Sequence, residues 1–233
     1  MRTRWYAGPS PQQLTLVWQS ASLLLGYPDR RLLETLPVVE AAAARLPATL
    51  GDPLREVAAH LALTPLEELQ VDYVSTFDTR RRCNLFLTYF LHGDTRKRGM
   101  ALLRFKQAYL RAGFRLAEAG EHAELPDHLC VVLEFGATVD HELARRLLTD
   151  HRAGLELLRL ALLDCHSPWA PAVEAVTRTL PRLRGEEHEV VRRLAADGPP
   201  EEEVGLSPYD LDHPLVPQPM AQPLPTPTLR GGH

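Results

Sequence analysis

The chain has 233 residues, of which 45% are hydrophobic and 24% charged, and its formal net charge is −4. This is the composition of a globular protein with one substantial core, and the negative charge argues against a general binder of polyanions. The first residues lack the apolar stretch of a signal peptide, and no run approaches the roughly 18 apolar residues of a membrane helix. The sequence therefore predicts a cytoplasmic protein without membrane insertion.

Apolar residues recur at helical spacing from the start of the chain. Ser10 and the proline after it suit the cap and the first turn of a helix that ends at Gly26. A second apolar pattern begins at Asp29, and Pro37 inside it predicts either a kink or two short helices. Both segments are expected to be mostly helical.

The next two helices lead into an unusual basic segment. A short helix should open at Asp52 and end near Leu63. The residues Thr-Pro-Leu-Glu at 64–67 have the spacing of a capping box with proline at the first helical position, which predicts another helix start. The apolar stripe of that helix runs to Phe77, where the basic segment begins.

The second half of the chain continues the helical pattern. A helix is expected over residues 95–112, with Gly113 just beyond its end. Further helices are predicted from Asp127, over 142–165 as one long element, and over 168–180 and 186–196. No alternating β-branched run and no internal repeat is present. The pattern predicts an all-α, single-domain helical bundle over residues 10–197.

Residues 198–233 differ from this domain in composition. They contain nine of the chain's twenty prolines and only scattered apolar residues. Such a segment cannot bury much surface, so we expect a disordered or extended tail. A solvated appendage is the simpler interpretation, and a partner-binding arm is the alternative.

The motifs of common enzymes and metal sites are missing from the sequence. It has no glycine-rich phosphate loop, no GxSxG and no HExxH, and its ten histidines lack ligand spacing. The three cysteines are far apart, and Cys83, although it follows three arginines, has no histidine base in a recognisable pattern. We therefore expect neither catalysis, nor a metal, nor a cofactor.

The most distinctive stretch is residues 77–106. Arginine and lysine clusters at 80–82 and 96–98 flank an apolar and aromatic core at 85–91, and residues 78–115 hold ten Lys and Arg against two Asp. A solvated helix face would carry mixed charges, whereas nucleic-acid binding would need a recognition motif that is not present. Arginine mixed with aromatic residues is typical of protein interfaces. Protein docking is thus favoured, and a helical nucleic-acid-binding regulator that uses residues 80–115 stays the alternative.

This stretch closely resembles the signature of the respiratory nitrate reductase molybdenum cofactor assembly chaperones, the delta-subunit-like branch of the redox-enzyme maturation chaperones. The matching residues are Phe77, Asp78, Arg80, Arg81, Arg82, Cys83, Leu85, Leu87, Thr88 and Tyr89, then residues 92–99, 101–103 and Lys106. The similarity extends to residues 23–28, 125–129 and 132–135, and covers roughly residues 12–180. The proline-rich tail lies outside it.

The resemblance implies an all-helical chaperone that is not an enzyme and needs no cofactor of its own. Such proteins bind the apo catalytic α subunit of nitrate reductase, largely through its N-terminal segment, and keep it competent for molybdenum cofactor insertion and membrane assembly in anaerobic respiration. They are not part of the final enzyme, and proteins that deliver the cofactor are a further class of partner.

The residues expected to contact the client lie in the basic segment. They are Arg80, Arg81, Arg82, Tyr89, Phe90, His92, Asp94, Arg96, Lys97, Arg98 and Lys106. The aspartates have a second interpretation, because Asp78 and Asp94 can instead pair with neighbouring arginines and shape the loop.

Overall fold

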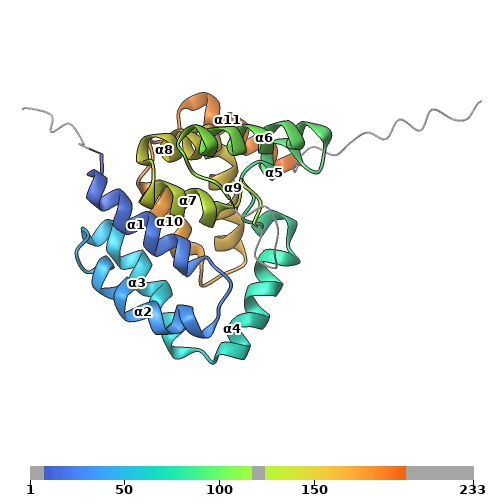
Figure 1. Ribbon diagram of the computed structural model, residues 1–233. Helices are drawn as coiled ribbons and strands as arrows, with labels where there is room; N and C mark the ends of the chain where they lie inside the picture. Colours follow the sequence, from blue (N-terminus) through green and yellow to red (C-terminus); the bar gives the residue numbers. More distant parts are fainter. Residues whose placement is uncertain (1–7, 117–123, 198–233) are drawn as a thin grey trace, which may run out of the picture. The chain divides into compact units, whose positions relative to one another are not determined.

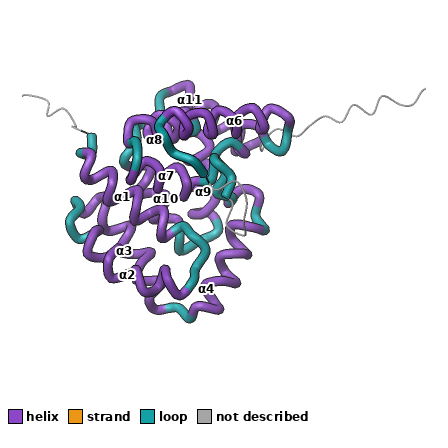
Figure 2. Tube along the Cα trace, in the orientation of Figure 1, coloured by secondary structure: helices purple, strands orange, loops and turns teal. Residues whose placement is uncertain are grey.

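The computed structural model describes residues 8–116 and 124–197, which belong to one compact unit within residues 1–202. These residues form eleven α-helices and two short helical turns, and they contain no strand (Figure 2). The all-α prediction is therefore confirmed. The tail at 198–233 lies outside the described residues, so its disorder and the domain boundary at residue 197 stay predictions.

Figure 1 shows the helices in the order of the chain. In chain order they are α1 (Pro11–Leu24), α2 (Arg30–Ala43), α3 (Ala48–Leu63), α4 (Leu66–Tyr73), α5 (Tyr89–His92), α6 (Arg96–Arg111), α7 (Leu129–Thr138), α8 (His141–Asp150), α9 (Arg152–Asp164), α10 (Ala170–Arg178) and α11 (Gly185–Asp197). Between α4 and α5 lie a π-helical turn, η1 (Val74–Asp78), and a 3₁₀ turn, η2 (Arg81–Cys83).

The core is built around α1, which contacts α2, α3, α7, α8 and α10. Trp18 of α1 is fully buried, and its indole Nε1 donates a hydrogen bond to Thr179 Oγ1 at 3.0 Å. α7 approaches α1 closely at Gly136, where an added Cβ would lie 2.7 Å from the Trp18 ring and 2.5 Å from the Ala144 Cβ. A residue without a side chain is therefore needed where α1, α7 and α8 meet.

Several predicted helix ends are confirmed. Ser10 caps α1 through a complete capping box, in which its hydroxyl accepts from the Gln13 backbone and the Gln13 side chain accepts from the Ser10 backbone. Gly113 follows α6 with φ of 75°, the left-handed conformation expected after a helix. Local sequence signals were sufficient at these two positions.

Three expectations in the first half are corrected. α2 continues through Pro37 as one helix, so the option of two short helices is wrong, while the kink stays a prediction. Pro37 is exposed, so water can solvate the carbonyl that loses its donor. α3 begins at Ala48, before Asp52. The capping box at 64–67 does not form, since the Thr64 hydroxyl donates to the His60 carbonyl at the end of α3.

Two predictions in the second half were also wrong. The expected long helix over 142–165 is broken into α8 and α9 at His151, whose ring Nδ1 lies 2.8 Å from the Leu147 carbonyl oxygen. α7 begins at Leu129, because the Asp127 carboxylate hydrogen-bonds to the Thr88 backbone and hydroxyl instead of capping the helix. In both places a polar side chain binds a partner that the sequence pattern does not reveal.

Candidate functional site

Asp127 holds the middle of the basic segment in place. It is fully buried, and its Oδ2 accepts hydrogen bonds from the Thr88 backbone N–H at 3.1 Å and from the Thr88 hydroxyl at 2.6 Å. The Leu87 N–H donates to the Asp127 carbonyl, and the Leu129 N–H donates to the Leu85 carbonyl. Residues 85–88 are therefore fixed to the start of α7 by four hydrogen bonds, two of them to a buried carboxylate.

The aromatic residues expected at the surface are part of the interior. Tyr89 is 8% exposed and Phe90 4% exposed. Phe90 packs on Gly154 of α9, where an added Cβ would lie 2.9 Å from the Phe90 Cβ. Both rings therefore lie beneath the surface, and their role as client contacts stays a prediction.

Arg98 belongs to the framework of the segment. Its guanidinium carbon lies 5.3 Å from the centre of the Phe86 ring and 5.7 Å from that of Tyr89, which are cation–π distances. Its Nη1 donates to Asp94 Oδ1 at 2.8 Å, and its Nε lies 3.4 Å from Thr88 Oγ1. The Arg98 side chain is 16% exposed, so most of its hydrogen-bonding surface is already used within the chain.

The turn before α6 depends on glycine. Gly93 has φ of 55°, and its N–H donates to the Tyr89 carbonyl at 2.7 Å. The Thr95 hydroxyl donates to the His92 carbonyl at 2.7 Å. Together with the pair between Asp94 and Arg98 these contacts shape the turn, which supports the structural interpretation of Asp94. Asp78, at the end of η1, is exposed.

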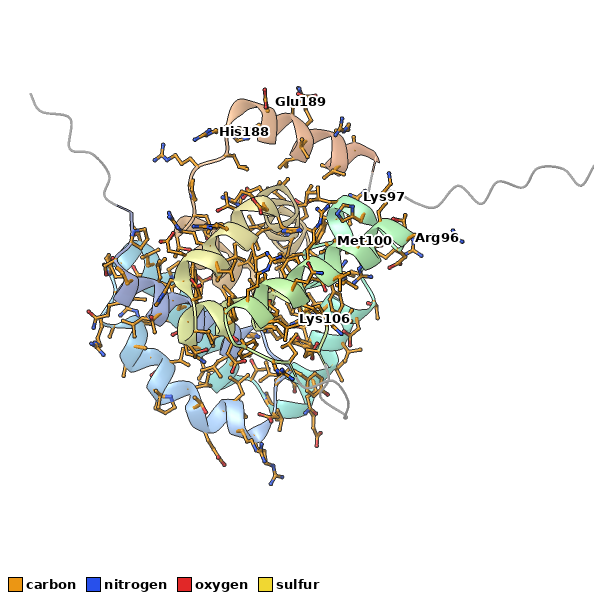
Figure 3. All side chains as sticks on the ribbon, turned by 45° about the horizontal axis from the view of Figure 1, so that its top comes forward. Arg96, Lys97, Met100, Lys106, His188 and Glu189 are labelled. Atoms are coloured by element: carbon orange, nitrogen blue, oxygen red, sulfur yellow. The ribbon has the colours of Figure 1, made fainter. Side chains whose placement is uncertain are left out.

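The remaining cations of the predicted set lie at the surface. They are Arg80, Arg81 and Arg82 around η2, and Arg96, Lys97 and Lys106 on α6, all of them exposed. Figure 3 shows Arg96 and Lys97 at the N-terminal end of α6, with Lys106 farther along it. The basic surface is defined here as these six residues, and the clamped segment beneath positions their backbone.

Burial makes the two reactive side chains of the segment less reactive. Burial and the neighbouring Cys165 thiol together raise the pKa of the Cys83 thiol to about 12, against the opposing effect of Arg80. Burial also lowers the pKa of His92, as do His151 and the nearby cations. At neutral pH Cys83 is therefore a thiol and His92 is uncharged, so neither supplies the nucleophile or the charge that its sequence context allows.

Two of the histidines that sequence spacing placed outside any ligand set have structural contacts, whereas His122 lies outside the described residues. His141 Nε2 lies 2.7 Å from the Thr15 hydroxyl, and His128 stacks edge-on against Phe86 with ring centres 5.3 Å apart. Among residues 8–116 and 124–197 no group of three or more His, Cys, Asp or Glu side chains is arranged to hold a metal ion. In the same ranges no helix has the length and hydrophobicity to cross a membrane.

A large hollow of the described unit lies away from the basic surface. It has a volume of about 1750 Å³ and opens among the starts of α1, α3 and α8 and the end of α10. Polar side chains in its wall include Asp140, His141, Arg145 and Arg178. These residues come from distant parts of the chain, and no motif in the sequence indicates that they meet.

Comparison with known proteins identifies the family. The family model described as "Nitrate reductase delta subunit" matches residues 43–175. The probable nitrate reductase molybdenum cofactor assembly chaperone NarJ of Bacillus subtilis is 31% identical over 72% of this chain and 90% of its own length. The chaperone NarJ of Escherichia coli K12 is 34% identical over 64% of this chain and 63% of its own length.

Two further comparisons define how far the likeness extends. The nitrate reductase-like protein NarX of Mycobacterium tuberculosis H37Rv is 42% identical over 70% of this chain, but the chain spans only 24% of that protein. The crystal structure of a putative redox enzyme maturation protein from Archaeoglobus fulgidus superposes with a TM-score of 0.51 at 27% identity, covering 76% of this chain and 98% of that one. The all-helical fold, the signature segment and these matches agree, and the chain belongs to the nitrate reductase delta-subunit family, which includes the molybdenum cofactor assembly chaperones.

Proposed function

We propose that this protein is a dedicated chaperone of respiratory nitrate reductase. It binds the apo catalytic α subunit, largely through the N-terminal segment of that subunit, and keeps it competent for molybdenum cofactor insertion and membrane assembly. It acts in the cytoplasm, is not part of the final enzyme, and catalyses no reaction of its own. Proteins that deliver the cofactor are a second class of partner.

The observation that carries this proposal is the clamped basic segment. Four backbone and side-chain hydrogen bonds anchor residues 85–88 to the start of α7, and the cations on either side of this anchor stay at the surface. A rigid support lowers the entropy that is lost when such side chains engage a partner. Exposed arginines can then bind carboxylates or backbone carbonyls of a peptide with directional hydrogen bonds.

We propose a smaller set of contact residues, supported by the burial of the others. Tyr89, Phe90 and Arg98 are needed inside the protein, and Asp94 is paired with Arg98. The proposed client contacts are therefore the six cations of the basic surface, with half-buried His92 at its edge. Tyr89, Phe90, Asp94 and Arg98 contribute indirectly, because they hold the backbone of the basic surface in place.

The test is calorimetric titration of the full chain with a synthetic peptide of the α subunit's N-terminal segment. We expect Arg80→Glu combined with Arg82→Glu to weaken binding about tenfold or more, because both side chains are exposed charges at the proposed interface. Helical circular dichroism should not change. The matched control is Arg30→Glu with Arg45→Glu, two exposed arginines on or beside α2, which should bind as tightly as the unmodified chain.

Two results would contradict the proposal. One is an unmodified chain that binds no peptide but shifts DNA or RNA in a salt-sensitive manner, which would favour a nucleic-acid-binding regulator. The other is an equal loss of binding in both double variants, which would mean that only overall charge matters.

A further inference from the structure

α6 has two apolar faces on opposite sides. The face toward the core is formed by three buried residues, Ala101, Phe105 and Tyr109. The outward face carries Met100, Leu103 and Leu110, with 61%, 44% and 55% of their surfaces exposed. An ordinary surface helix has one apolar stripe toward the core and polar residues opposite it. The outward stripe of α6 therefore needs an explanation outside the core.

The outward stripe has the spacing of a helix–helix seam. Met100, Leu103, Gln107 and Leu110 are separated by three, four and three residues, as are the a and d positions of a coiled coil. One polar residue among them, Gln107, is compatible with such a seam, where a single polar core position can set the alignment of the helices. A second helix can therefore pack lengthwise on this face.

The edges of the stripe are positively charged. Lys97, Arg104 and Arg111 recur at seven-residue spacing along one edge, Lys106 lies on the other, and α6 contains no Asp or Glu. All four side chains are exposed. Basic residues also occupy the first turn of α6, which has no acidic residue. Positive charge at a helix N-terminus opposes the helix dipole by about 0.3–1 kcal/mol for each group, so this arrangement disfavours the isolated helix.

Gly99 is a second feature that the fold itself does not require. It lies inside α6, on the edge of the stripe, and no atom lies within 4 Å of the place where a Cβ would be. Glycine inside a helix costs about 1 kcal/mol relative to alanine. No close neighbour within the chain accounts for it, whereas the backbone of a partner helix could approach closely at this point.

We propose that the outward face of α6 docks an amphipathic helix of a partner protein, whose apolar stripe is bordered by Glu and Asp residues. The apolar seam supplies the buried contact, and the Lys and Arg edges select an acidic partner. A second copy of α6 is disfavoured, because its cations would face cations. The stripe has Leu but no Trp or Phe to anchor it in a lipid surface. Nucleic acid is disfavoured too, because its phosphates would gain little from an apolar stripe.

The docking face does not include residues 80–82, on which the client test above depends, and its proposal does not require the peptide of the α subunit. Figure 3 shows Met100 beside Arg96 and Lys97, so the seam and part of the basic surface share one helix, and Lys97 and Lys106 belong to both. The two proposals are distinguished by variants that change only one surface: the Arg80 and Arg82 pair for the client, and the Met100 and Leu103 pair for the seam.

The test uses a fluorescein-labelled synthetic helix of three heptads, with Leu at a and d and Glu at e and g. Its own Glu repulsion keeps it from self-pairing. Fluorescence anisotropy with the full chain should show saturable binding that weakens as salt rises. We expect Met100→Ser with Leu103→Ser, and Lys97→Glu with Arg104→Glu, each to weaken binding about tenfold or more.

The control variants change equivalent residues elsewhere. Val38→Ser with Val71→Ser removes two other exposed apolar side chains, 66% and 72% exposed, and should leave peptide binding within about twofold, as should the Arg80 and Arg82 double variant. The proposal is overturned if the peptide does not bind, or if a matched peptide with Lys in place of Glu binds equally well. It is also overturned if the chain binds vesicles containing phosphatidylglycerol but not the peptide, which would make the face a lipid-binding surface.

Discussion

Asp127 shows how a single buried carboxylate can set the geometry of a surface. Its Oδ2 accepts two hydrogen bonds from Thr88, and no hydrogen-bond partner is observed for its Oδ1 within the described residues. A buried carboxylate is costly unless it is well bonded. The Asp127 carboxylate offsets this cost because it holds residues 85–88 against the start of α7, beneath the basic surface.

We predict that Asp127→Ala lowers the free energy of unfolding by about 2 kcal/mol or more, because it leaves two buried Thr88 donors without an acceptor. Asp127→Asn should cost less, since the amide oxygen can still accept. Urea denaturation of the two variants tests this prediction. It would be contradicted if the Ala variant were as stable as the unmodified chain.

Half-buried histidines predict a dependence of stability on pH. Burial is the main cause that lowers the pKa of His92, His128 and His151 below the ordinary value of 6.5. The unfolded chain therefore takes up protons first as the pH falls. The stability that these neutral side chains contribute is fully present above pH 6.5 and is lost as the pH falls through their lowered values.

Urea denaturation at pH 7.5 and at pH 5.0 measures this loss. We expect a lower free energy of unfolding at pH 5.0, and a smaller difference for His151→Gln, because glutamine can still donate to the Leu147 carbonyl without titrating. A pH difference that does not change in the variant would exclude His151 as a contributor.

At the residue scale the sequence indicated which amino acids are unusual but not which way they face. The spacing of arginines around 77–106 predicted a functional segment, and Arg80, Arg82 and Lys97 are exposed. Arg98 has the same side chain as its neighbours, yet it is largely covered by aromatic rings. Whether a cation faces solvent depends on the tertiary neighbours of its backbone position, and that information is not local.

Two helical glycines have different surroundings, one inside the packed core and one on the proposed docking face. Gly136 of α7 lies against the Trp18 ring, whereas Gly99 of α6 faces open space. The same substitution by alanine should therefore have opposite effects at the two positions.

Gly136→Ala should destabilise the fold by about 1–3 kcal/mol, because the new methyl group overlaps a buried ring and the Ala144 side chain. Gly99→Ala should stabilise it by up to about 1 kcal/mol through higher helix propensity. Thermal unfolding of both variants gives the comparison. A Gly99→Ala variant that unfolds earlier would mean that the helix needs this glycine for its own structure.

At the scale of elements, prediction succeeded where the signal was local. The cap of α1 and the end of α6 depend on a few adjacent residues, and both were placed correctly. The break between α8 and α9 could not be read from apolar spacing, because that spacing continues through His151. The sequence pattern also did not separate the outward stripe of α6 from the buried one, because the apolar residues of both recur at helical spacing.

At the scale of the whole molecule, the fold class followed from periodicity, and the family followed from the signature segment. No sequence motif predicted the hollow among α1, α3, α8 and α10, because its lining residues come from distant parts of the chain. The chain thus has a clamped basic surface, a separate hollow, and a helix with a second apolar face.

We propose that this chain binds nitrate reductase before the enzyme is complete. The decisive experiment is co-purification of the untagged chain with tagged α subunit, with one α-subunit sample made in cells that lack molybdenum cofactor and the other carrying its full cofactor. We expect the chain to accompany the apo subunit and to be absent from the complete one. Absence from both samples, or equal recovery with both, would contradict it.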